Sequence, residues 1–559
     1  MPLAAPQPSR GAAAVSRAVL RRVPLAAPQL SKIRGGNAKI RGGAACMSVA
    51  STAGVPLSAV SISKSECKAL QWEGDLIILP FWQPANDGMP ELSAEMTALD
   101  VRLDGTIAAL IDVNEFKGTA GSSATTLLPR TSAIKKLAVV GLGKVADFKS
   151  SGAKKWGEFI ASCAKAEKAK TAAVVLPAFG EAPLDVTMQQ AAYEAMLLGL
   201  SPDIRYKSDT TSDEVKPPPL AEVHVLDADQ DAITRARHIA SGVLLTRGLV
   251  GSPANYATPT ALALAAEAIA SEFTTMSLKV LERDECEALG MGAYLGVSQG
   301  AAEPPKFIHL TYKPAGAPSK KVKKVAIIGK GLTFDSGGYN IKAGAGSMIE
   351  KMKFDMGGAG AVLGAARVVG DTAPEHVEAH FIIAACENMV SERAMRPGDI
   401  LTASNNKTIE VINTDAEGRL TLADALVYAE KLGELDAVVD IATLTGACII
   451  ALGNDYGGLW SSSDELASQL QASAKATGEL LWHMPLAAEY KEQVKSTIAD
   501  LKNVGERGGG SITAALFLQE FVKETPWAHM DIAGPVWNDK AGGATGYAVR
   551  TLSHFVCSE

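Results

Sequence analysis

Short apolar runs with the length of β-strands alternate along this chain with longer segments of helical periodicity. In the first half, the strand-like runs cover residues 75–81, 137–140 and 171–177, and the helical patterns cover residues 153–170 and 186–200. In the second half, apolar runs recur at residues 307–312, 325–328, 379–385, 437–441 and 527–532. This alternation predicts mainly parallel or mixed β-sheets flanked by helices, which is the α/β fold class.

The chain divides into two such blocks near residue 252. A helical pattern over residues 230–249 is broken by Ser252-Pro253-Ala254-Asn255, and Thr258-Pro259 then has the form of a new helix start. We therefore expect two domains, an N-terminal α/β domain over residues 66–250 and a larger C-terminal domain over residues 255–559. The polar stretch 201–220, which contains three consecutive prolines, is expected to form a surface excursion.

The first segment of the chain has the composition of a targeting sequence. Residues 1–65 contain nine Lys or Arg and no Asp or Glu, and residues 1–50 are rich in Ala, Arg, Ser, Gly and Pro. An acid-free, Arg- and Ser-rich leader predicts an organelle transit peptide over residues 1–50, since Arg17, Arg21 and Arg22 interrupt any secretory apolar core. The high content of Ala and Gly favours the chloroplast, with the mitochondrion as the alternative. A disordered cytosolic tail is the simplest competing interpretation.

The remainder of the chain is acidic, and this excludes some classes of partner. Of 54 Lys and Arg residues, 45 follow residue 65, where all 61 Asp and Glu lie, so this part carries a net charge of −16. An acidic body argues against a nucleic-acid partner. The chain has no uncharged apolar run of about 18 residues, so no membrane span is expected. Its seven Cys form no CxxC pair and are interpreted as reduced thiols, with Cys386 and Cys448 buried in apolar runs.

Two glycine-rich segments that follow apolar runs concentrate acidic and basic side chains. The first covers residues 329–338 and continues to residue 355, and the second covers residues 413–420. In α/β folds, functional side chains gather in loops at the carboxyl ends of strands, so we expect these groups to share one site. A single acidic pair in a loop is usually only solvated surface, but here seven groups coincide. They are Asp335, Asp355, Asp415, Glu417, Lys330, Lys342 and Arg419.

Four carboxylates in one desolvated site would repel one another, because each like-charged neighbour raises a carboxyl pKa. Two divalent cations about 3.5–4 Å apart, bridged by carboxylates, would remove that repulsion and could activate a water molecule. Oxygen ligands without thiolates suit Mg or Mn, and a nitrogen donor admits Zn. Asp415 and Glu417 are two residues apart in what we expect to be an extended loop, so their side chains are predicted to point the same way.

These segments resemble the leucyl (cytosol) aminopeptidase family, and in particular its plant-type organellar members. The resemblance lies in NTDAEGRL at residues 413–420, GKGLTFDSGG at 329–338 and MKFDMGGA at 352–359. It continues through residues 252–255, 442–446 and 529–534, and so covers at least residues 250–535. The octapeptide is highly specific. The resemblance implies that the C-terminal domain is a dimetal catalytic domain.

The resemblance also implies roles for the matching residues. Lys330, Asp335, Asp355 and Glu417 would bind one metal, and Asp335, Asp415 and Glu417 the other, with Asp415 also offering its main-chain carbonyl. A ligating Lys330 must be neutral, and an adjacent dication can lower its pKa. Lys342 would polarise the scissile carbonyl, and Arg419 would hold a bicarbonate that relays a proton. Met352, Thr443 and Gly446, with Lys342, would contact the substrate.

The implied reaction is removal of N-terminal residues, preferably Leu and other apolar residues, from short peptides. The free α-amine would bind one metal, and a water bridging the two metals would attack the first peptide carbonyl. The two ions would be Mn or Zn, with Mg as a further possibility. The resemblance further implies a homohexamer whose active sites face an internal cavity that admits short peptides.

Two departures from the common form of the family stand near the expected pocket. The segment between Lys342 and Asp355 is about two residues longer than in many relatives, although plant-type members resemble this longer form. Gly251 precedes Ser252-Pro253-Ala254-Asn255 where Asn is usual. The longer segment makes the first-residue preference less predictable than the chemistry.

Other candidate motifs favour structural roles. His376 and His380 have zinc-like spacing, but the sequence around them predicts a strand, in which residues four apart lie about 13 Å from each other. The run Gly141-Leu142-Gly143-Lys144-Val145-Ala146 is a loose dinucleotide fingerprint that close helix–strand packing explains equally well. The alternative functions are an inactive relative of the family and a nucleotide- or DNA-binding protein. An inactive relative should lack at least one of the seven charged residues, and none of them is missing here.

Overall fold

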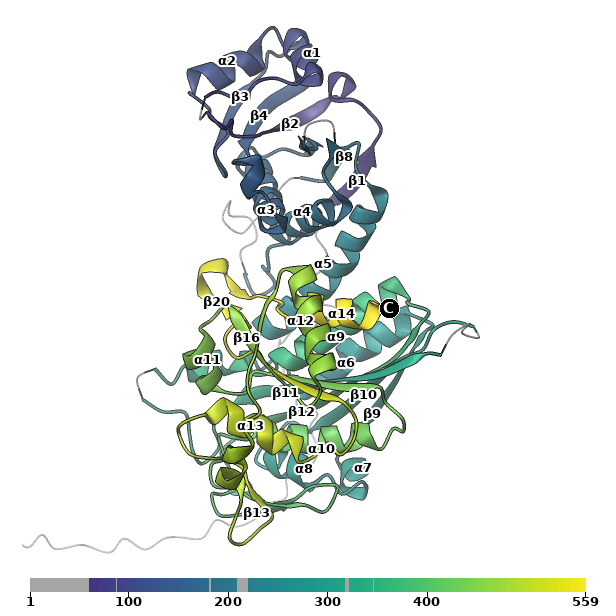
Figure 1. The fold of residues 1–559 in the computed structure, drawn as a ribbon, viewed down its shortest axis with the longest axis vertical. Helices are drawn as coiled ribbons and strands as arrows, with labels where there is room; N and C mark the ends of the chain where they lie inside the picture. The colour runs from purple at the N-terminus through teal and green to yellow at the C-terminus, as the bar shows by residue number, and fades with distance from the viewer. Residues whose placement is uncertain are drawn as a thin grey trace, which may run out of the picture. The chain divides into compact units, whose positions relative to one another are not determined.

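A computed structural model of the chain describes residues 60–558, apart from positions 87, 180–181, 209–219, 317–320 and 345 (Figure 1). The predicted transit peptide at residues 1–50 lies outside the described residues, as does most of the polar excursion before residue 220. Among the residues described, no helix is both long enough and apolar enough to cross a membrane.

The first sheet has six strands in the order β1-β8-β5-β2-β4-β3, all parallel except β3. Its core strand β2 is apolar and buried from Leu76 to Phe81, because both faces of the sheet are covered there. Leu76 and Ile78 pack in one cluster with residues of α3 and α4, and Ile77 and Leu79 pack in another with residues of α1 and α2. The bounds are β1 Ser61–Ser65, β2 Gly74–Phe81, β3 Ser123–Leu127, β4 Ile134–Gly141, β5 Thr171–Val175, β8 Glu222–Leu226, α1 Ala94–Arg102, α2 Thr106–Val113, α3 Ser150–Ala166 and α4 Val186–Gly199.

Two helices follow where the sequence predicted a helix, a break and a second helix. Helix α5 (Gln230–Gly251) is capped by Asp229, whose side chain accepts from the Ala232 N–H, and it packs against α4 and against α9 (Gly357–Thr372). Helix α6 (Pro259–Glu272) begins with proline, and the Thr258 hydroxyl accepts from the Ala261 N–H. The predicted helix start at Thr258-Pro259 is thus confirmed.

The second sheet has eight strands in the order β17-β16-β19-β15-β11-β12-β10-β9. Its four central strands, β19, β15, β11 and β12, are mutually parallel, and β10, β9 and β16 run antiparallel to their inner neighbours. The mixed α/β fold class is therefore confirmed. The bounds are β9 Met276–Leu281, β10 Lys306–Tyr312, β11 Lys323–Asp335, β12 Val377–Asn388, β15 Ala437–Ala442, β16 Tyr456–Ser461, β17 Leu480–His483 and β19 Trp527–Asp531.

Helices cover both faces of this sheet (Figure 1), and the central strands accordingly carry apolar side chains on both faces. Helices α9 (Gly357–Thr372), α14 (Val549–Cys557), α5 and α6 bury one face, and α8 (Gly292–Ser298), α10 (Gly418–Glu430) and α13 (Gly510–Gln519) bury the other. Three further helices and one 3-10 helix are α7 Arg283–Ala288, α11 Gly446–Leu452, α12 Asp464–Thr477 and η4 Ile349–Phe354. A small sheet is formed by β13 Ile400–Thr402, β14 Thr408–Glu410 and β18 Leu501–Lys502. Two short strand pairs are β6 Ala178–Phe179 with β7 Ala182–Pro183, and β20 Trp537–Asn538 with β21 Gly543–Ala544.

One predicted loop is part of a strand. The sequence placed residues 329–335 in a loop after a short strand, but strand β11 continues through them to Asp335. These residues stay paired with β12, for example Lys330 with Ala384, with one register shift between Leu332 and Phe334. The glycines that resembled loop residues serve close packing instead. A Cβ at Gly329 would lie 2.7 Å from the Cα of Ala359 in α9.

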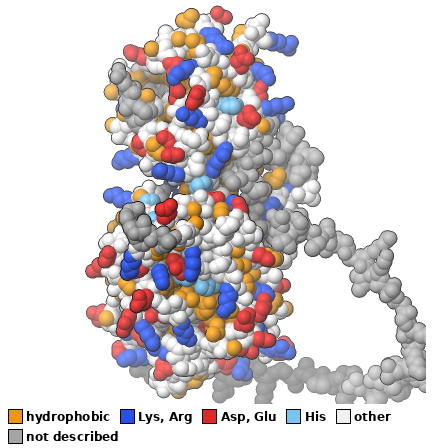
Figure 2. Space-filling model, turned by 90° about the vertical axis from the view of Figure 1, so that its right-hand side faces the viewer, with side chains coloured by type: hydrophobic (Ala, Val, Ile, Leu, Met, Phe, Trp, Pro, Cys, Tyr) orange, Lys and Arg blue, Asp and Glu red, His pale blue; other side chains and the backbone are white. Residues whose placement is uncertain are grey.

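The charged side chains are mixed on the surface. On the face drawn in Figure 2, the described Lys and Arg side chains lie among Asp and Glu side chains, without a broad basic field.

Candidate metal centre

The candidate site lies at the carboxyl ends of the central parallel strands. Lys330 and Asp335 lie on β11, Asp355 directly follows η4, and Thr443 directly follows β15. Asp415 and Glu417 lie in the turn that precedes α10, and Glu417 is the residue before its first helical position. The expected extended loop at residues 415–417 is wrong, because Glu417 already has helical dihedral angles (φ −80°, ψ −34°).

The structure brings the predicted ligands together. Carboxylate oxygens of Asp335, Asp415 and Glu417 all lie within 4.8 Å of one another. Lys330 joins Asp355 to this group, because its Nζ lies 2.8 Å from Asp355 Oδ2 and 2.9 Å from Glu417 Oε1. The Lys342 Nζ lies 2.8 Å from Asp335 Oδ2 and 2.5 Å from Asp415 Oδ1. Four carboxylates and two ammonium groups therefore form one connected cluster.

Burial makes the ionised carboxylates unfavourable in this cluster. Burial and the neighbouring Asp335 charge raise the pKa of Glu417 to about 8, although Lys330 opposes the shift. Burial likewise raises the pKa of Asp355 to about 6 against the effect of Lys330, and the pKa of Asp415 is also raised by burial and by Asp335. The carboxylates outnumber the ammonium groups, so the cluster favours additional positive charge.

These residues fit a divalent cation. Glu417 Oε2 is buried and accepts no hydrogen bond from any described residue, so a strong acceptor is left over in the cluster. The carboxylate oxygens form a donor set that hard or borderline cations accept, and the Lys330 nitrogen would join them once a bound cation has displaced its proton. The acidic cluster could therefore hold metal, in agreement with the prediction from composition alone.

The two lysines differ in their freedom. Burial alone would lower the pKa of Lys330, but Asp355, Glu417 and Asp335 raise it above its ordinary value. A Cβ at Gly418 would lie 2.5 Å from Lys330 Cε, so glycine at the start of α10 is what lets Lys330 lie against that helix. Lys342, whose pKa burial would lower but the carboxylates raise, keeps 17% of its side chain exposed and so remains accessible from solvent.

Arg419 lies beside the carboxylates with part of its hydrogen-bonding capacity unused. It is buried in the first turn of α10, and its Nη1 donates to the main-chain carbonyl of Asn503 at 2.7 Å. Its Nε is buried and donates to no described group. Burial lowers the pKa of Arg419 to about 10, against the pull of Glu417. An anion is the natural partner for such a donor.

Two of the predicted pocket residues, Thr443 and Met352, lie near Asp355. The Thr443 hydroxyl donates to Asp355 Oδ1 at 2.8 Å, and Met352 is a mostly buried residue of η4, three positions before Asp355. Gly446 is the first residue of α11, and a Cβ built there meets no atom within 4 Å, so space is open at that position. Asp531, at the end of β19, holds the intervening turn by accepting from the Leu444 N–H and the Thr445 hydroxyl.

Sequence reasoning missed the side chains that support the cluster. Asn388, the last residue of β12, is 1% exposed, and its Nδ2 donates to Asp335 Oδ1 at 2.8 Å and to the Thr414 carbonyl at 3.0 Å. Its place at the carboxyl end of a central strand was the only available signal.

The other candidate motifs have structural explanations. His380 lies on strand β12, as predicted, and bonds to His309 rather than to His376. In the loop after β4, the Leu142 and Gly143 N–H groups donate to the Phe81 and Gly118 carbonyls, which leaves neither for a phosphate. Cys386 and Cys448 are buried free thiols, as predicted.

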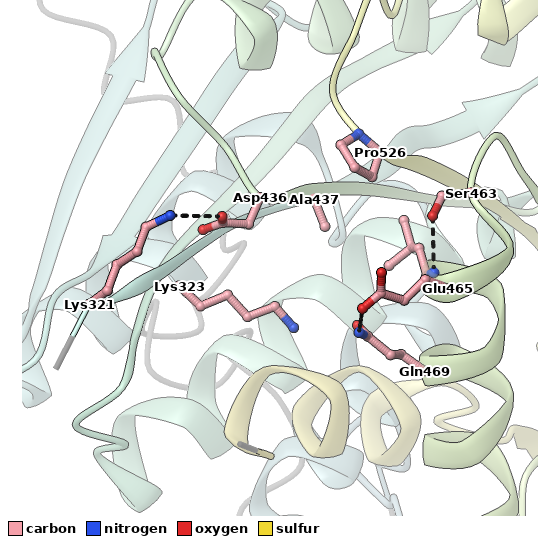
Figure 3. Close-up of a pocket in the computed structure, with 9 residues that line it drawn as sticks. Lys321, Lys323, Asp436, Ala437, Ser463, Glu465, Gln469 and Pro526 are labelled. Atoms are coloured by element: carbon pink, nitrogen blue, oxygen red, sulfur yellow. Dashed lines mark hydrogen bonds and ion pairs between the residues drawn. The ribbon is translucent and has the colours of Figure 1, made fainter.

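A separate cavity of about 340 Å³ lies at the opposite, amino-terminal ends of β11 and β15 (Figure 3). Lys321 and Asp436 lie together on one side of it, with Lys321 Nζ 3.8 Å from Asp436 Oδ1, and Lys323 points toward Glu465 and Gln469 of α12. It holds no cluster of buried carboxylates, so the chemistry concentrates at the other end of the sheet.

Comparison with known proteins agrees with this site. The model of the cytosol aminopeptidase family catalytic domain matches residues 244–553, and that of the family's N-terminal domain matches residues 78–210. The chain is 54% identical over 503 residues to a probable cytosol aminopeptidase of Cyanothece, which covers 89% of this chain and 99% of that protein. A probable cytosol aminopeptidase of Synechocystis is 53% identical over 506 residues, covering 89% and 99%. A solved structure of a tomato leucine aminopeptidase mutant matches with a TM-score of 0.79 and 40% identity, over 89% of this chain and 97% of that one.

The α/β fold and the acidic cluster agree with a peptidase, the class to which the matching family models and relatives belong. The chain belongs to the cytosol aminopeptidase family. Membership supports aminopeptidase activity on peptides.

Proposed function

We propose that this chain releases N-terminal residues, preferably Leu and other apolar residues, from short peptides at a two-metal site. The observation that carries the proposal is the buried cluster of four carboxylates and two lysines at the carboxyl ends of β11 and β15. Lys330, Asp335, Asp355 and Glu417 would hold one cation, and Asp335, Asp415 and Glu417 the other. When bound, two divalent cations, Mn or Zn or else Mg, supply Lewis acidity toward the scissile carbonyl and lower the pKa of water.

Lys342 is proposed to stabilise the reacting carbonyl. It is partly exposed, and the carboxylates around it raise its pKa, so it carries its positive charge at neutral pH. A fixed positive charge near the carbonyl oxygen stabilises the negative charge that develops there, and it does so more strongly than in water because the site is desolvated.

Arg419 is proposed to bind bicarbonate. Its buried Nε lacks an acceptor among the described residues, and its Nη1 is fixed on Asn503, so the guanidinium is held in one orientation. A bicarbonate bound there would supply a group that both accepts and donates a proton.

The first side chain of the substrate is proposed to lie among Met352, Thr443 and Gly446. The open space at Gly446 accommodates an apolar side chain, and burial of a Leu-sized group stabilises the complex by about 1.5–3 kcal/mol. Replacing Gly446 by Val should therefore lower kcat/KM for leucine amide more than for alanine amide.

The proposal is tested by comparing leucine amide with N-acetyl-leucine amide as substrates, with an Asp415→Ala variant as the control. We expect release of leucine from the first substrate only, and none from the variant. Equal cleavage of the blocked substrate would exclude an exopeptidase that requires a free α-amine.

Two further proposals concern the whole protein. We propose a homohexamer and import into the chloroplast, with the mitochondrion as the alternative. The leader composition supports import, and an alignment that covers 99% of the Cyanothece relative leaves about a tenth of this chain unmatched. A fluorescent protein fused behind residues 1–50 should accumulate in chloroplasts, and a diffuse cytosolic signal would contradict import.

A further inference from the structure

A single buried residue, Asn503, connects the turn that carries two of the carboxylates with the arginine beside them. Asn503 directly follows β18, which pairs in parallel with β14, so the small sheet brings it alongside the segment after β14. Its side chain is fully buried. The residue lies more than 80 positions away from the turn that it contacts.

The side-chain amide of Asn503 bonds to both sides of this turn. Its Oδ1 accepts from the Ile412 N–H at 2.8 Å and the Asn413 N–H at 3.3 Å. Its Nδ2 donates to the Asn413 carbonyl at 2.7 Å and to the Ala416 carbonyl at 3.3 Å. Only a side chain that accepts and donates at once can make this set of bonds.

The main chain of Asn503 completes the connection. Its N–H donates to the Glu410 carbonyl at 3.0 Å, and its carbonyl accepts from Arg419 Nη1 at 2.7 Å. One residue therefore holds the turn on both sides of Asp415 and fixes the guanidinium that follows Glu417 by two positions. A displacement of Asn503 would move Asp415, Glu417 and Arg419 relative to one another.

From these contacts we infer that Asn503 is a positioning residue for the metal site, which sets the geometry of Asp415 and Glu417 and orients Arg419 without touching the substrate. The inference rests on the proposed two-metal function. Residues that orient metal ligands typically contribute about tenfold or more to metal affinity or activity. Burial of the peptide groups of the turn makes the loss of one partner costly, because its donors and acceptors would then be unsatisfied.

The test uses the full chain and its Asn503→Asp variant, which keeps the shape and the acceptor but removes the donor. The control is Asn405→Asp in the turn between β13 and β14 of the same small sheet, where the side chain only accepts, from the Lys407 N–H. After chelation, Mn²⁺ affinity is measured by calorimetry, and kcat and KM are measured with leucine amide. Asn503→Asp should bind Mn²⁺ about tenfold or more weakly and lose kcat by a similar factor, while KM changes little.

The control Asn405→Asp should stay within about twofold of the unmodified chain in both measurements. Native Mn²⁺ affinity and kcat in folded Asn503→Asp would overturn the inference. Where that variant does not fold, Asn503→Ser is measured by the same criterion, and failure of both to fold would also overturn it, because Asn503 would then be a core residue only. An unmodified chain that binds none of Mn²⁺, Zn²⁺ and Mg²⁺ would instead contradict the proposed function.

Discussion

At the residue scale, the buried carboxyl group of Glu417 destabilises the metal-free chain. Its carboxyl group is buried, its Oε2 has no hydrogen-bond partner among the described residues, and burial raises its pKa to about 8. An unused acceptor and a disfavoured charge are costs in the metal-free chain. The proposed cations would turn both into favourable interactions.

This view predicts opposite effects of Glu417→Gln with and without metal. The metal-free variant should melt at the same temperature as the unmodified chain or higher, because a neutral amide replaces a carboxyl group that must take up a proton to be buried. Addition of Mn²⁺ should then raise its melting temperature much less than that of the unmodified chain, and leucine amide hydrolysis should fall about a hundredfold. Glu430→Gln, at the far end of the same helix, is the control, and a full Mn²⁺ response in Glu417→Gln would refute its role as a ligand.

Gly418 makes a second prediction at this scale. A Cβ there would lie 2.5 Å from Cε and 2.7 Å from Nζ of Lys330, so Gly418→Ala should push Lys330 away from Asp355 and Glu417. We expect a loss of about 1–3 kcal/mol in unfolding free energy, measured by denaturant titration, together with reduced activity. Gly251→Ala, at a position with open space around it, should change neither, and an unaffected Gly418→Ala would disprove the close approach.

At the element scale, the strands fix the site because β11, β12, β15 and β19 end at the same edge. The sequence predicted most of these strands, since apolar runs covered on both faces are easily recognised, and the acidic motifs followed them directly. The extent of β11 could not be predicted, because Gly329 and Gly331 have the appearance of loop residues until the close approach of α9 to Gly329 and of β12 to Gly331 is known. Asn388 and Asn503 could not be predicted either, because they contact partners between 26 and 93 positions away and no spacing rule connects them.

Two neighbouring strands also carry a pH-sensitive pair. On β10 and β12, His309 Nε2 lies 3.0 Å from His380 Nδ1, with the Tyr428 hydroxyl of α10 3.0 Å from His309 Nδ1. Burial, His380 and Lys279 of β9 lower the pKa of His309 to about 4. His309 in the unfolded chain therefore takes up a proton near pH 6.5, whereas in the folded chain it stays neutral down to about pH 4. The free energy of unfolding falls as the pH falls from about 6.5 to about 4.

We expect the metal-free chain to lose about 2 kcal/mol through His309 between pH 7 and pH 5. Denaturant titrations at the two pH values, compared with His309→Gln, isolate this contribution from other titrating groups. The variant should lose less stability on acidification than the unmodified chain. An identical loss in both would show that His309 is not responsible.

At the scale of the whole molecule, the chain combines a family-typical body with a basic leader. The cyanobacterial relatives are matched over almost their full length, whereas residues 1–50 have a composition found nowhere else in this chain. The family match thus bears on the fold and the chemistry, whereas the location and the oligomeric state of the protein need their own experiments.

The proposed assembly predicts a defined mass. Light scattering after size-exclusion chromatography of the chain without residues 1–50 should give about six times the subunit mass. The mass should not change on dilution through the micromolar range. A monomer with full activity would contradict both the hexamer and the proposed size filter for peptides.

The most direct test of the two-metal site is a titration of the chelated chain with Mn²⁺, in which bound ions per chain and hydrolysis of leucine amide are measured together. The account predicts no activity without metal, and activity that rises as two ions bind per chain. Both ions should be bound more weakly by Glu417→Gln. Full hydrolysis of leucine amide by the chelated chain, before any Mn²⁺ is bound, would contradict the account.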